Sequence, residues 1–499
     1  MSQYSQLGHR ARSVLERTKH SLLIDGRWVA SHSDTTFPSY APQTGAEIGA
    51  FALADSADTD LAVAAAQRAF ADAAWRDLGP DQRSALLWRV AELADTHAVD
   101  LAQLESLDTG KPISAALETD VAEFGKFFRY FAGWVSKIEG RTIPINAPQT
   151  LAYTLRQPVG VCALIIPWNY PLMMASWKLA PALAAGCTTI LKPAEQTPLS
   201  ALLMGELFLE AGFPPGVVNI LTGDGATTGT ALTGHRGIDK VAFTGSTEVG
   251  RIIVRASADS NLKKVSLELG GKSPHIIFQD ADLDRAIPGA SSGVFYNAGQ
   301  ACTAGTRLLV HRDIAEQVTQ GLLAEAARLR PGPEFDPETR LGPLISAEQV
   351  QRVRGYIDIA RTEGAQVHTV PYPDATDTSE LYVEPTVLVG ATNSMRSSRE
   401  EIFGPVVSII TFESEAEAIH IANDTHYGLG AGLWTRDLAR AHRVAARLQS
   451  GSVWVNVYGP VDAALPFGGF KESGWGREMG EEAIRLYTEH KSIWMNLDG

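Results

Sequence analysis

Cysteine is scarce in this sequence of 499 residues, which contains only Cys162, Cys187 and Cys302. Three scattered thiols are too few for a disulfide framework or a thiolate metal site, so we expect no metal centre and a reducing compartment, the cytoplasm. A run of about 18 apolar residues, the length that spans a membrane, is also missing. The first 20 residues contain arginines without an apolar core, which argues against a secretory signal and leaves a transit peptide open.

Positive charge is in deficit as well, because 43 Lys and Arg face 57 Asp and Glu, a formal net charge of -14. Nucleic acids and anionic membranes attract basic surfaces, so neither is expected as a partner. With 45% hydrophobic and 20% charged residues, the composition is that of a globular protein. A chain of this length exceeds one hydrophobic core, and we expect two or three domains.

Segments typical of strands and helices alternate along the chain, which favours an α/β fold with parallel sheets. Short β-branched runs bounded by Gly or Pro predict buried strands at 162–168, 187–193 and 216–223. Apolar runs that end in glycine predict helices at 171–186 and 199–212. This succession of strands and helices is typical of a nucleotide-binding domain.

A second α/β region is expected from residue 273 to about residue 470, with a helix at 313–330. Two extended segments, 141–160 and 487–499, have no obvious core of their own. We therefore expect these two segments to pair with each other or with another subunit.

The stretch NAGQACTAGTR, residues 297–307, surrounds Cys302 with small residues. Gly299 and Gly305 allow the backbone to approach a ligand closely, and small side chains leave the thiol unobstructed. A nucleophilic thiol needs a base or a positive environment, and this stretch contains no histidine. Cys302 is therefore either a nucleophile or a buried core cysteine, and the stretch alone leaves both open.

A candidate base lies in the stretch VSLELGG, residues 265–271. Strand alternation there places Ser266 and Glu268 on the face opposite the apolar residues. A glutamate at the end of an apolar strand would have a raised pKa and could serve as a general base. A strand-end surface acid is the alternative.

The stretch PWNYPLMMASWK, residues 167–178, places Asn169 at the mouth of a helix expected to begin near Pro171. On that helix Met174, Trp177 and Lys178 share one face. A side-chain amide at the helix mouth can donate to a developing oxyanion. The alternative is that Asn169 only caps the helix and the apolar residues only form core.

Seven motifs occur in the order and spacing that mark the NAD(P)-dependent aldehyde dehydrogenase superfamily, and the resemblance covers nearly the whole chain. The motifs are PWNYP, KPAEQTP, FTGSTEVG, LELGGKSP, GQACTAG, EEIFGPV and PFGGFKESGWGRE. The resemblance implies a Rossmann-like NAD-binding domain at 1–140 and 161–271, an α/β catalytic domain at 272–470, and a bridging β segment at 141–160 and 487–499. It also implies a homodimer or homotetramer.

The resemblance also implies catalytic roles. Cys302 resembles the nucleophile that attacks the aldehyde carbonyl to give a thiohemiacetal, and the Asn169 amide with the Cys302 N–H resembles the oxyanion hole. Hydride then leaves for the nicotinamide. Glu268 resembles the base that activates water to release the acid, and Lys178 with Glu478 resembles a proton relay.

Cofactor positions are implied in the same way. Lys192 resembles the residue that binds the adenosine ribose, and Glu195 lies where the family binds the ribose hydroxyls. A carboxylate there would repel a 2′-phosphate, which favours NAD over NADP. Gly245 and Ser246 resemble the helix start beneath the pyrophosphate. Further positions expected at the cofactor are Ile166, Pro167, Trp168, Gly225, Gly229, Phe243, Glu401 and Phe403.

The positions that match the family's substrate tunnel are mostly aromatic or apolar: Phe124, Tyr170, Met174, Trp177, Tyr296, Val461 and Phe467. No Arg or Lys among them could hold a substrate carboxylate. An aromatic wall suits an arylaldehyde, and VDAALPFGG, residues 461–469, resembles the phenylacetaldehyde-oxidising members. The same rings, with Asp462, could instead hold the cation of betaine aldehyde or an aminoaldehyde.

Three other functions remain open from the sequence. An enzyme that passes the acyl group to coenzyme A would not need Glu268 to activate water. A thiol esterase without redox chemistry would not need Lys192 and Glu195. A structural protein derived from this family would not need every catalytic position to be filled, as it is here.

Overall fold

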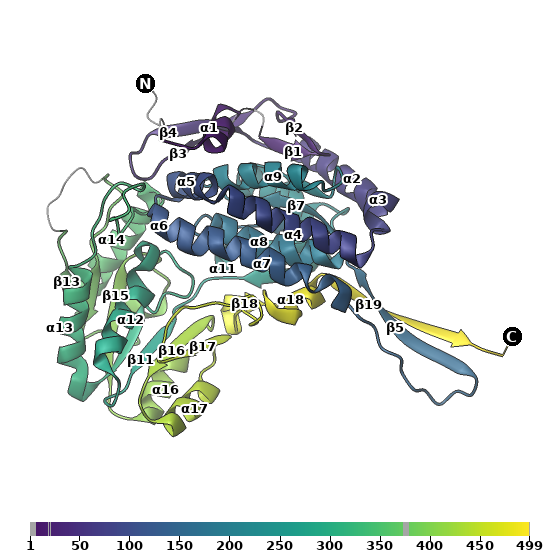
Figure 1. The fold of residues 1–499 in the computed structure, drawn as a ribbon. Coiled ribbons are helices and arrows are strands. Elements are labelled where there is room, and N and C mark those ends of the chain that lie inside the picture. The colour runs from purple at the N-terminus through teal and green to yellow at the C-terminus, as the bar shows by residue number, and fades with distance from the viewer. Residues whose placement is uncertain (1–5, 18, 20, 373–378, 499) are drawn as a thin grey trace.

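The computed structural model describes residues 6–17, 19, 21–372 and 379–498. Residues 1–5, 18 and 20 of the N-terminal segment considered for a targeting signal, and Gly499 of the predicted bridging segment, lie outside the described residues. Two large sheets and two small antiparallel ribbons organise the chain (Figure 1). The predicted α/β fold class is confirmed.

The first sheet has a parallel centre and antiparallel edges. Its order is β18 (Gly474–Trp475), β10 (Lys264–Glu268), β9 (Lys240–Thr244), β6 (Val161–Ile165), β7 (Thr188–Lys192), β8 (Val218–Ile220), β1 (Leu22–Ile24) and β2 (Arg27–Val29). The strands predicted at 162–168, 187–193 and 216–223 are therefore confirmed as β6, β7 and β8. Each is shorter than predicted, with five residues in β6 and in β7 and three in β8, and Gly216, at a left-handed φ of 81°, lies before β8 rather than in it.

The second sheet is parallel except at one edge, where β13 runs antiparallel to β14. Its order is β13 (Gln366–Thr369), β14 (Thr386–Val389), β15 (Val406–Phe412), β12 (Arg307–His311), β11 (Pro274–Ile277), β16 (Gly430–Trp434) and β17 (Ser452–Val455). The smaller ribbons are β3 (Thr36–Tyr40) with β4 (Glu47–Ala52), and β5 (Thr150–Pro158) with β19 (Thr488–Asn496).

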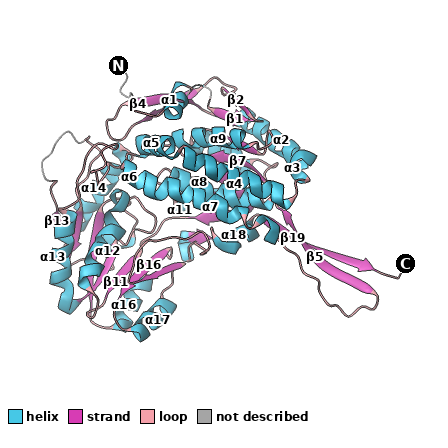
Figure 2. Cartoon of the chain, viewed as in Figure 1, coloured by secondary structure: helices cyan, strands magenta, loops and turns pink. Residues whose placement is uncertain are grey.

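Helices pack on the sheets and on one another (Figure 2). They are α1 (His9–Glu16), α2 (Ser56–Ala71), α3 (Ala73–Arg76), α4 (Pro80–Thr96), α5 (Ala98–Thr109), α6 (Ile113–Ala115), α7 (Ala122–Ala132), α8 (Pro171–Ala185), α9 (Leu199–Ala211), α10 (Thr230–Gly234), α11 (Thr247–Asp259), α12 (Leu283–Phe295), α13 (Ala315–Ala326), α14 (Ala347–Thr362), α15 (Arg396–Arg399), α16 (Glu415–Asn423), α17 (Leu438–Arg447) and α18 (Gly480–Leu486). The predicted helices at 171–186 and 199–212 are α8 and α9, and each ends at a left-handed glycine, Gly186 or Gly212. The helix predicted at 313–330 is shorter, as α13.

Both faces of the first sheet are buried, which explains its continuous apolar strands. In β6, Cys162 and Leu164 pack into the core cluster that includes α8 and α9. The alternate residues Val161, Ala163 and Ile165 pack into a separate cluster with α2. A parallel sheet covered on both faces favours apolar residues at successive positions, as in β6.

The ribbon of β5 and β19 projects from the body of the molecule, with the C-terminus near its tip (Figure 1). Its register runs from Thr488 opposite Pro158 to Asn496 opposite Thr150. The expectation that the two extended segments pair with each other is confirmed. Trp494, on this ribbon, is 67% exposed.

Residues 471–486, which lie in none of the predicted domain segments, join the first sheet. Within them β18 pairs with β10, and α18 contacts α8. The passage from the first sheet to the second falls between Glu268, the end of β10, and Pro274, the start of β11. Within the described ranges, no helix is both long and apolar enough to cross a membrane, and no group of three His, Cys, Asp or Glu could hold a metal ion.

Candidate active site

A cavity of about 770 Å³ has Cys302 in its wall. Of the residues predicted for the site, those that line the cavity are Pro167, Trp168, Asn169, Tyr170, Met174, Trp177, Gly245, Ser246, Tyr296, Cys302, Glu401, Phe403, Val461 and Phe467. They come from segments far apart in the sequence, so the fold brings the predicted nucleophile, amide, cofactor positions and aromatic wall to one space.

The backbone around Cys302 is held by close main-chain packing. Gly299 has a φ of 73°, and a Cβ there would lie 2.1 Å from the carbonyl oxygen of Gly404. A Cβ on Gly271 would lie 2.3 Å from the carbonyl oxygen of Cys302. Both glycines are therefore required by contact, and the LELGG stretch packs directly against the main chain of Cys302.

The Cys302 thiol is partly exposed, whereas Cys162 and Cys187 are fully buried. Desolvation, with the nearby carboxylates Glu401 and Glu268, raises the pKa of Cys302 to about 12. The thiol is therefore protonated in this state, and its activation requires a base.

Asn169 lies directly before α8, which begins with Pro171 as predicted. Its Nδ2 donates to the carbonyl oxygen of Gln300 at 2.9 Å, which ties the amide to the turn that precedes Cys302. A primary amide has two N–H donors, so a second remains for a ligand oxygen. The amide is buried, and its position beside the cysteine turn suits an oxyanion-binding donor.

Glu268, Lys178 and Glu478 lie behind the cavity wall rather than in its lining. The Lys178 ammonium pairs with one carboxylate oxygen of Glu478 and donates to Oγ1 of Thr244 at 2.8 Å. In the described part of the chain, neither Oε2 of Glu268 nor Oε2 of Glu478 has a hydrogen-bond partner. Burial, and next the Glu478 charge, raise the pKa of Glu268 well above its usual range, while Lys178 opposes the shift. The group is therefore a buried base beside a charged pair.

A second part of the site lies where the first sheet's parallel strands end. Ser246 caps α11, a helix of 13 residues, by accepting from the N–H of Val249, so the helix N-terminus opens at the cavity. A Cβ on Gly245 would lie 2.4 Å from the Phe243 ring, so only glycine fits there. The Lys192 ammonium lies 3.7 Å from a Glu195 carboxylate oxygen at the end of β7.

On the other side of this region, a Glu401 carboxylate oxygen accepts from the N–H of Gly271 at 2.8 Å. Burial raises the pKa of Glu401 to about 7. The Phe403 ring meets the Trp168 ring edge to face at 5.2 Å. Ile166 and Phe243 are buried behind the lining, and Gly225 and Gly229 form a short π-helical turn after β8.

The residues predicted for the substrate tunnel line the cavity, with the exception of Phe124. The ring centroids of Trp177 and Phe467 lie 5.0 Å apart, and the Tyr296 hydroxyl lies 2.7 Å from Oγ1 of Thr119. Phe124 is fully buried on α7, 4.7 Å from the Phe128 ring, and does not line the cavity. The prediction that Phe124 lies in the substrate tunnel therefore differs from the structure, because the face of α7 that carries Phe124 packs into the core.

Sequence reasoning missed several lining residues: Glu118, Thr119, Glu123, Thr244, Gln349, Arg352, Tyr427 and Tyr458. Gln349 and Arg352 lie on α14, and no sequence motif around them indicates ligand binding. Only the tertiary fold brings α14 close to Glu401. For example, a guanidinium nitrogen of Arg352 donates to the Glu401 carbonyl oxygen at 2.5 Å. Tyr458 could have been suspected, because it lies three residues before the predicted Val461.

Residues 28–493 match the model of the aldehyde dehydrogenase family. The chain belongs to this family. It is 47% identical to retinal dehydrogenase 2 of Gallus gallus over 481 residues, which is 96% of this chain and 92% of that protein.

Solved structures of the family share the fold over nearly the whole chain. An indole-3-acetaldehyde dehydrogenase of P. syringae, in complex with NAD+, has 41% identity and a TM-score of 0.94, covering 97% of this chain and 99% of that one. The betaine aldehyde dehydrogenase of Staphylococcus aureus, also in complex with NAD+, has 39% identity and a TM-score of 0.94, covering 99% and 97%. The bound cofactor of both relatives agrees with the NAD dependence expected from the sequence.

Proposed function

We propose that this aldehyde dehydrogenase oxidises an aromatic or other apolar aldehyde to its carboxylic acid with NAD, through a covalent intermediate on Cys302. The observation that carries the proposal is the position of Cys302: it lies in the wall of one cavity that also holds the Asn169 amide, the aromatic wall and the opening of α11.

The residues predicted to bind the cofactor have the chemistry that NAD binding requires. The α11 N-terminus can meet the pyrophosphate, and Gly245, where a Cβ would strike the Phe243 ring, keeps the approach open. The Lys192 and Glu195 pair suits the hydroxyls of the adenosine ribose, and the Glu401 carboxylate suits those of the nicotinamide ribose. When bound, the cofactor supplies the hydride acceptor.

In the first half of the reaction, Cys302 Sγ forms a bond to the aldehyde carbon, and its proton passes to Glu268. The carbonyl oxygen becomes an oxyanion that accepts from the Asn169 amide and the Cys302 N–H. Loss of hydride from the thiohemiacetal carbon leaves a thioester on Cys302, with the carbonyl double bond restored.

Before the second half, Glu268 releases the first proton to solvent. It then takes a proton from water, and the water oxygen attacks the thioester carbon. The carbon–sulfur bond breaks, which releases the acid, and the Cys302 thiolate takes the proton back from Glu268. The Oε2 atoms of Glu268 and Glu478 have no hydrogen-bond partner among the described residues and so can take part in passing the proton on, with the Glu478 charge balanced by Lys178. An enzyme that transfers the acyl group to coenzyme A would not need this buried base.

The aromatic wall supports an arylaldehyde such as phenylacetaldehyde. Trp177, Phe467 and Tyr170 offer stacking surfaces, and the indole-bearing substrate named for the P. syringae relative is aromatic as well. A second candidate is a betaine aldehyde or aminoaldehyde dehydrogenase, since the Glu118 and Glu123 carboxylates line the same cavity and would attract a cation.

NADH formation from purified protein tests the proposal, with kcat/KM compared for phenylacetaldehyde, betaine aldehyde, an aminoaldehyde and a straight-chain aldehyde. A preference for the arylaldehyde supports the stacking wall, whereas a preference for the cationic aldehydes supports the second candidate. Acid formation without NAD would favour a thiol esterase. If no aldehyde gives NADH, aldehyde oxidation is excluded and a non-catalytic structural role is favoured.

We further propose that the β5 and β19 ribbon joins subunits of a homodimer or homotetramer, because it projects with apolar side chains exposed. We also propose the domain division given by the sequence and a cytoplasmic location, which the exclusively free thiols suit. Sedimentation of the chain, compared with a variant that lacks residues 488–498, tests the role of the ribbon.

A further inference from the structure

Tyr458, for which the sequence suggests no role, holds the residue next to the nucleophile. It follows β17 and lines the cavity. Its hydroxyl donates to the carbonyl oxygen of Thr303 at 2.6 Å. On the other side, the carbonyl of Cys302 packs against Gly271. The carbonyl groups of Cys302 and Thr303 are therefore both held by contacts with other parts of the chain.

The Tyr458 ring occupies a slot formed by glycines. A Cβ on Gly293 would lie 2.8 Å from Cδ1 of the ring, and one on Gly432 would lie 2.4 Å from Cδ2. A Cβ on Gly305 would lie 3.2 Å from Cζ. Three glycines from different segments are needed to admit this ring, so its position is specified by the fold.

An imidazole and an indole support the far side of the ring. His275 stacks on Tyr458 with ring centroids 4.2 Å apart. Nε2 of His275 accepts from Nε1 of Trp434 at 2.6 Å. Burial lowers the pKa of His275 to about 3, so the imidazole is neutral and can accept this bond. The three rings form an uncharged stack behind the cysteine turn.

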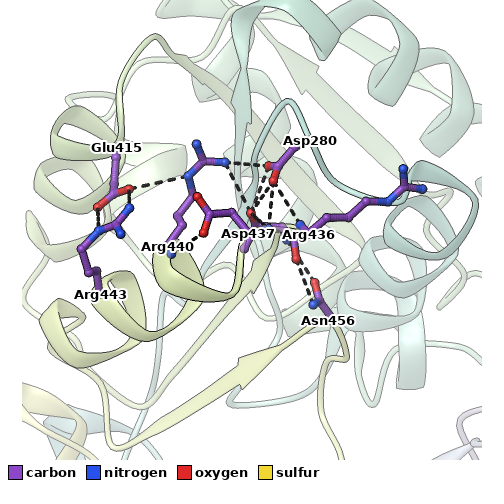
Figure 3. A network of polar contacts seen from close by, with 8 residues as sticks. Asp280, Glu415, Arg436, Asp437, Arg440, Arg443 and Asn456 are labelled. Carbon is purple, nitrogen blue, oxygen red and sulfur yellow. Dashed lines mark hydrogen bonds and ion pairs between the residues drawn. The ribbon is translucent and has the colours of Figure 1, made fainter.

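The chain that leads into Tyr458 is also fixed, by a polar network at the start of α17 (Figure 3). Asn456 accepts from the N–H of Thr435 and donates to its carbonyl, both at 3.0 Å. Asp280 accepts from Oγ1 of Thr435 at 2.8 Å and from Arg440 at 2.7 Å. The network therefore restrains the segment two residues before Tyr458.

We propose that Tyr458 is a positioning residue that holds the Cys302 loop so that Sγ and the Cys302 N–H face the aldehyde carbon and oxygen. This inference rests on the proposed function. The backbone N–H groups of Cys302 and Thr303 also favour the thiolate, and release of the Thr303 carbonyl would disorder both donors.

Tyr458→Phe tests the proposal, because it keeps the ring and removes only the hydrogen bond. Tyr372→Phe is a matched control: its hydroxyl also donates to a main-chain carbonyl, that of Val383, at 2.6 Å, and Tyr372 does not line the cavity. Three readouts apply to both variants: thermal midpoint, kcat and KM for an aldehyde, and the rate at which iodoacetamide alkylates Cys302, followed by mass spectrometry of its peptide.

We expect similar thermal midpoints for the two variants, since each loses one bond of the same kind. Only Tyr458→Phe should lower kcat, by about tenfold with KM within about twofold, and slow the alkylation of Cys302. Equal kcat and alkylation in the two variants would overturn the proposal, and so would a raised KM with unchanged kcat. If the unmodified protein oxidises no aldehyde, the proposed function fails, while the alkylation rates still test the position of the loop.

Discussion

The buried charges around Glu268 should shift the pH dependence of the reaction in opposite directions when they are removed one at a time. Glu478 raises the pKa of Glu268 and Lys178 lowers it. In the proposed mechanism, deacylation needs the ionised form of Glu268, so its rate should rise with pH through that pKa. Glu478→Gln should move the midpoint to lower pH, and Lys178→Met should move it to higher pH.

The size of each shift follows from Coulomb's law. Charges separated by about 5 to 10 Å, at an effective dielectric constant of about 20, interact by about 1.7 to 3.3 kcal/mol. This corresponds to about one to two pH units. Both variants break a buried pair, which costs about 3 to 5 kcal/mol of stability, so each must first be shown to be folded.

The assay is the pH dependence of thioester hydrolysis, measured after a single turnover with NAD. Thr244→Val is the matched control, because it removes the 2.8 Å bond to the Lys178 ammonium without changing any charge. We expect its midpoint to stay within about half a unit of the unmodified protein. If the pH midpoint shifted in the same direction in both charge variants, or by as much in Thr244→Val, Glu478 and Lys178 would not set the pKa of Glu268 by their charges.

Three further predictions concern the nucleophile, the cofactor and the second sheet. Cys302→Ala should abolish aldehyde oxidation while NAD still quenches tryptophan fluorescence on binding, and retained turnover would exclude Cys302 as the nucleophile. Glu195→Gln should raise kcat/KM for NADP by about tenfold relative to NAD, because the repelling charge at the end of β7 is lost; an unchanged ratio would place the 2′-phosphate elsewhere. Asp280→Ala should lower the free energy of unfolding by about 2 to 3 kcal/mol, since four donors lose their acceptor, and an unchanged denaturation midpoint would argue against this estimate.

The sequence predicts those parts of the fold that local pattern controls. The strands β6 and β7 are short, fully buried runs that contain β-branched residues, and α8 and α9 end at glycines that take left-handed φ values. Local pattern does not determine where an element packs. Phe124 was expected at the substrate and lies in the core, because the apolar face of α7 meets α4 and α8.

The same reason explains which cavity-lining and neighbouring residues the sequence indicates and which it does not. Cys302, Glu268 and Asn169 belong to motifs whose chemistry can be recognised from neighbours in the sequence. Arg352 and Tyr458 reach the site through tertiary contacts, from an amphipathic helix and from a loop after an edge strand. Their side chains donate to the main-chain carbonyls of Glu401 and Thr303, and no sequence pattern marks these contacts.

The proposed oxidation proceeds through an acyl group on Cys302 that Glu268 helps to hydrolyse. Mass spectrometry of Glu268→Gln after mixing with phenylacetaldehyde and NAD tests both roles at once. We expect NADH equal to the number of active sites, followed by much slower turnover, and an acyl adduct on the peptide that contains Cys302. Unchanged steady turnover without an adduct, or an adduct on another residue, would contradict it.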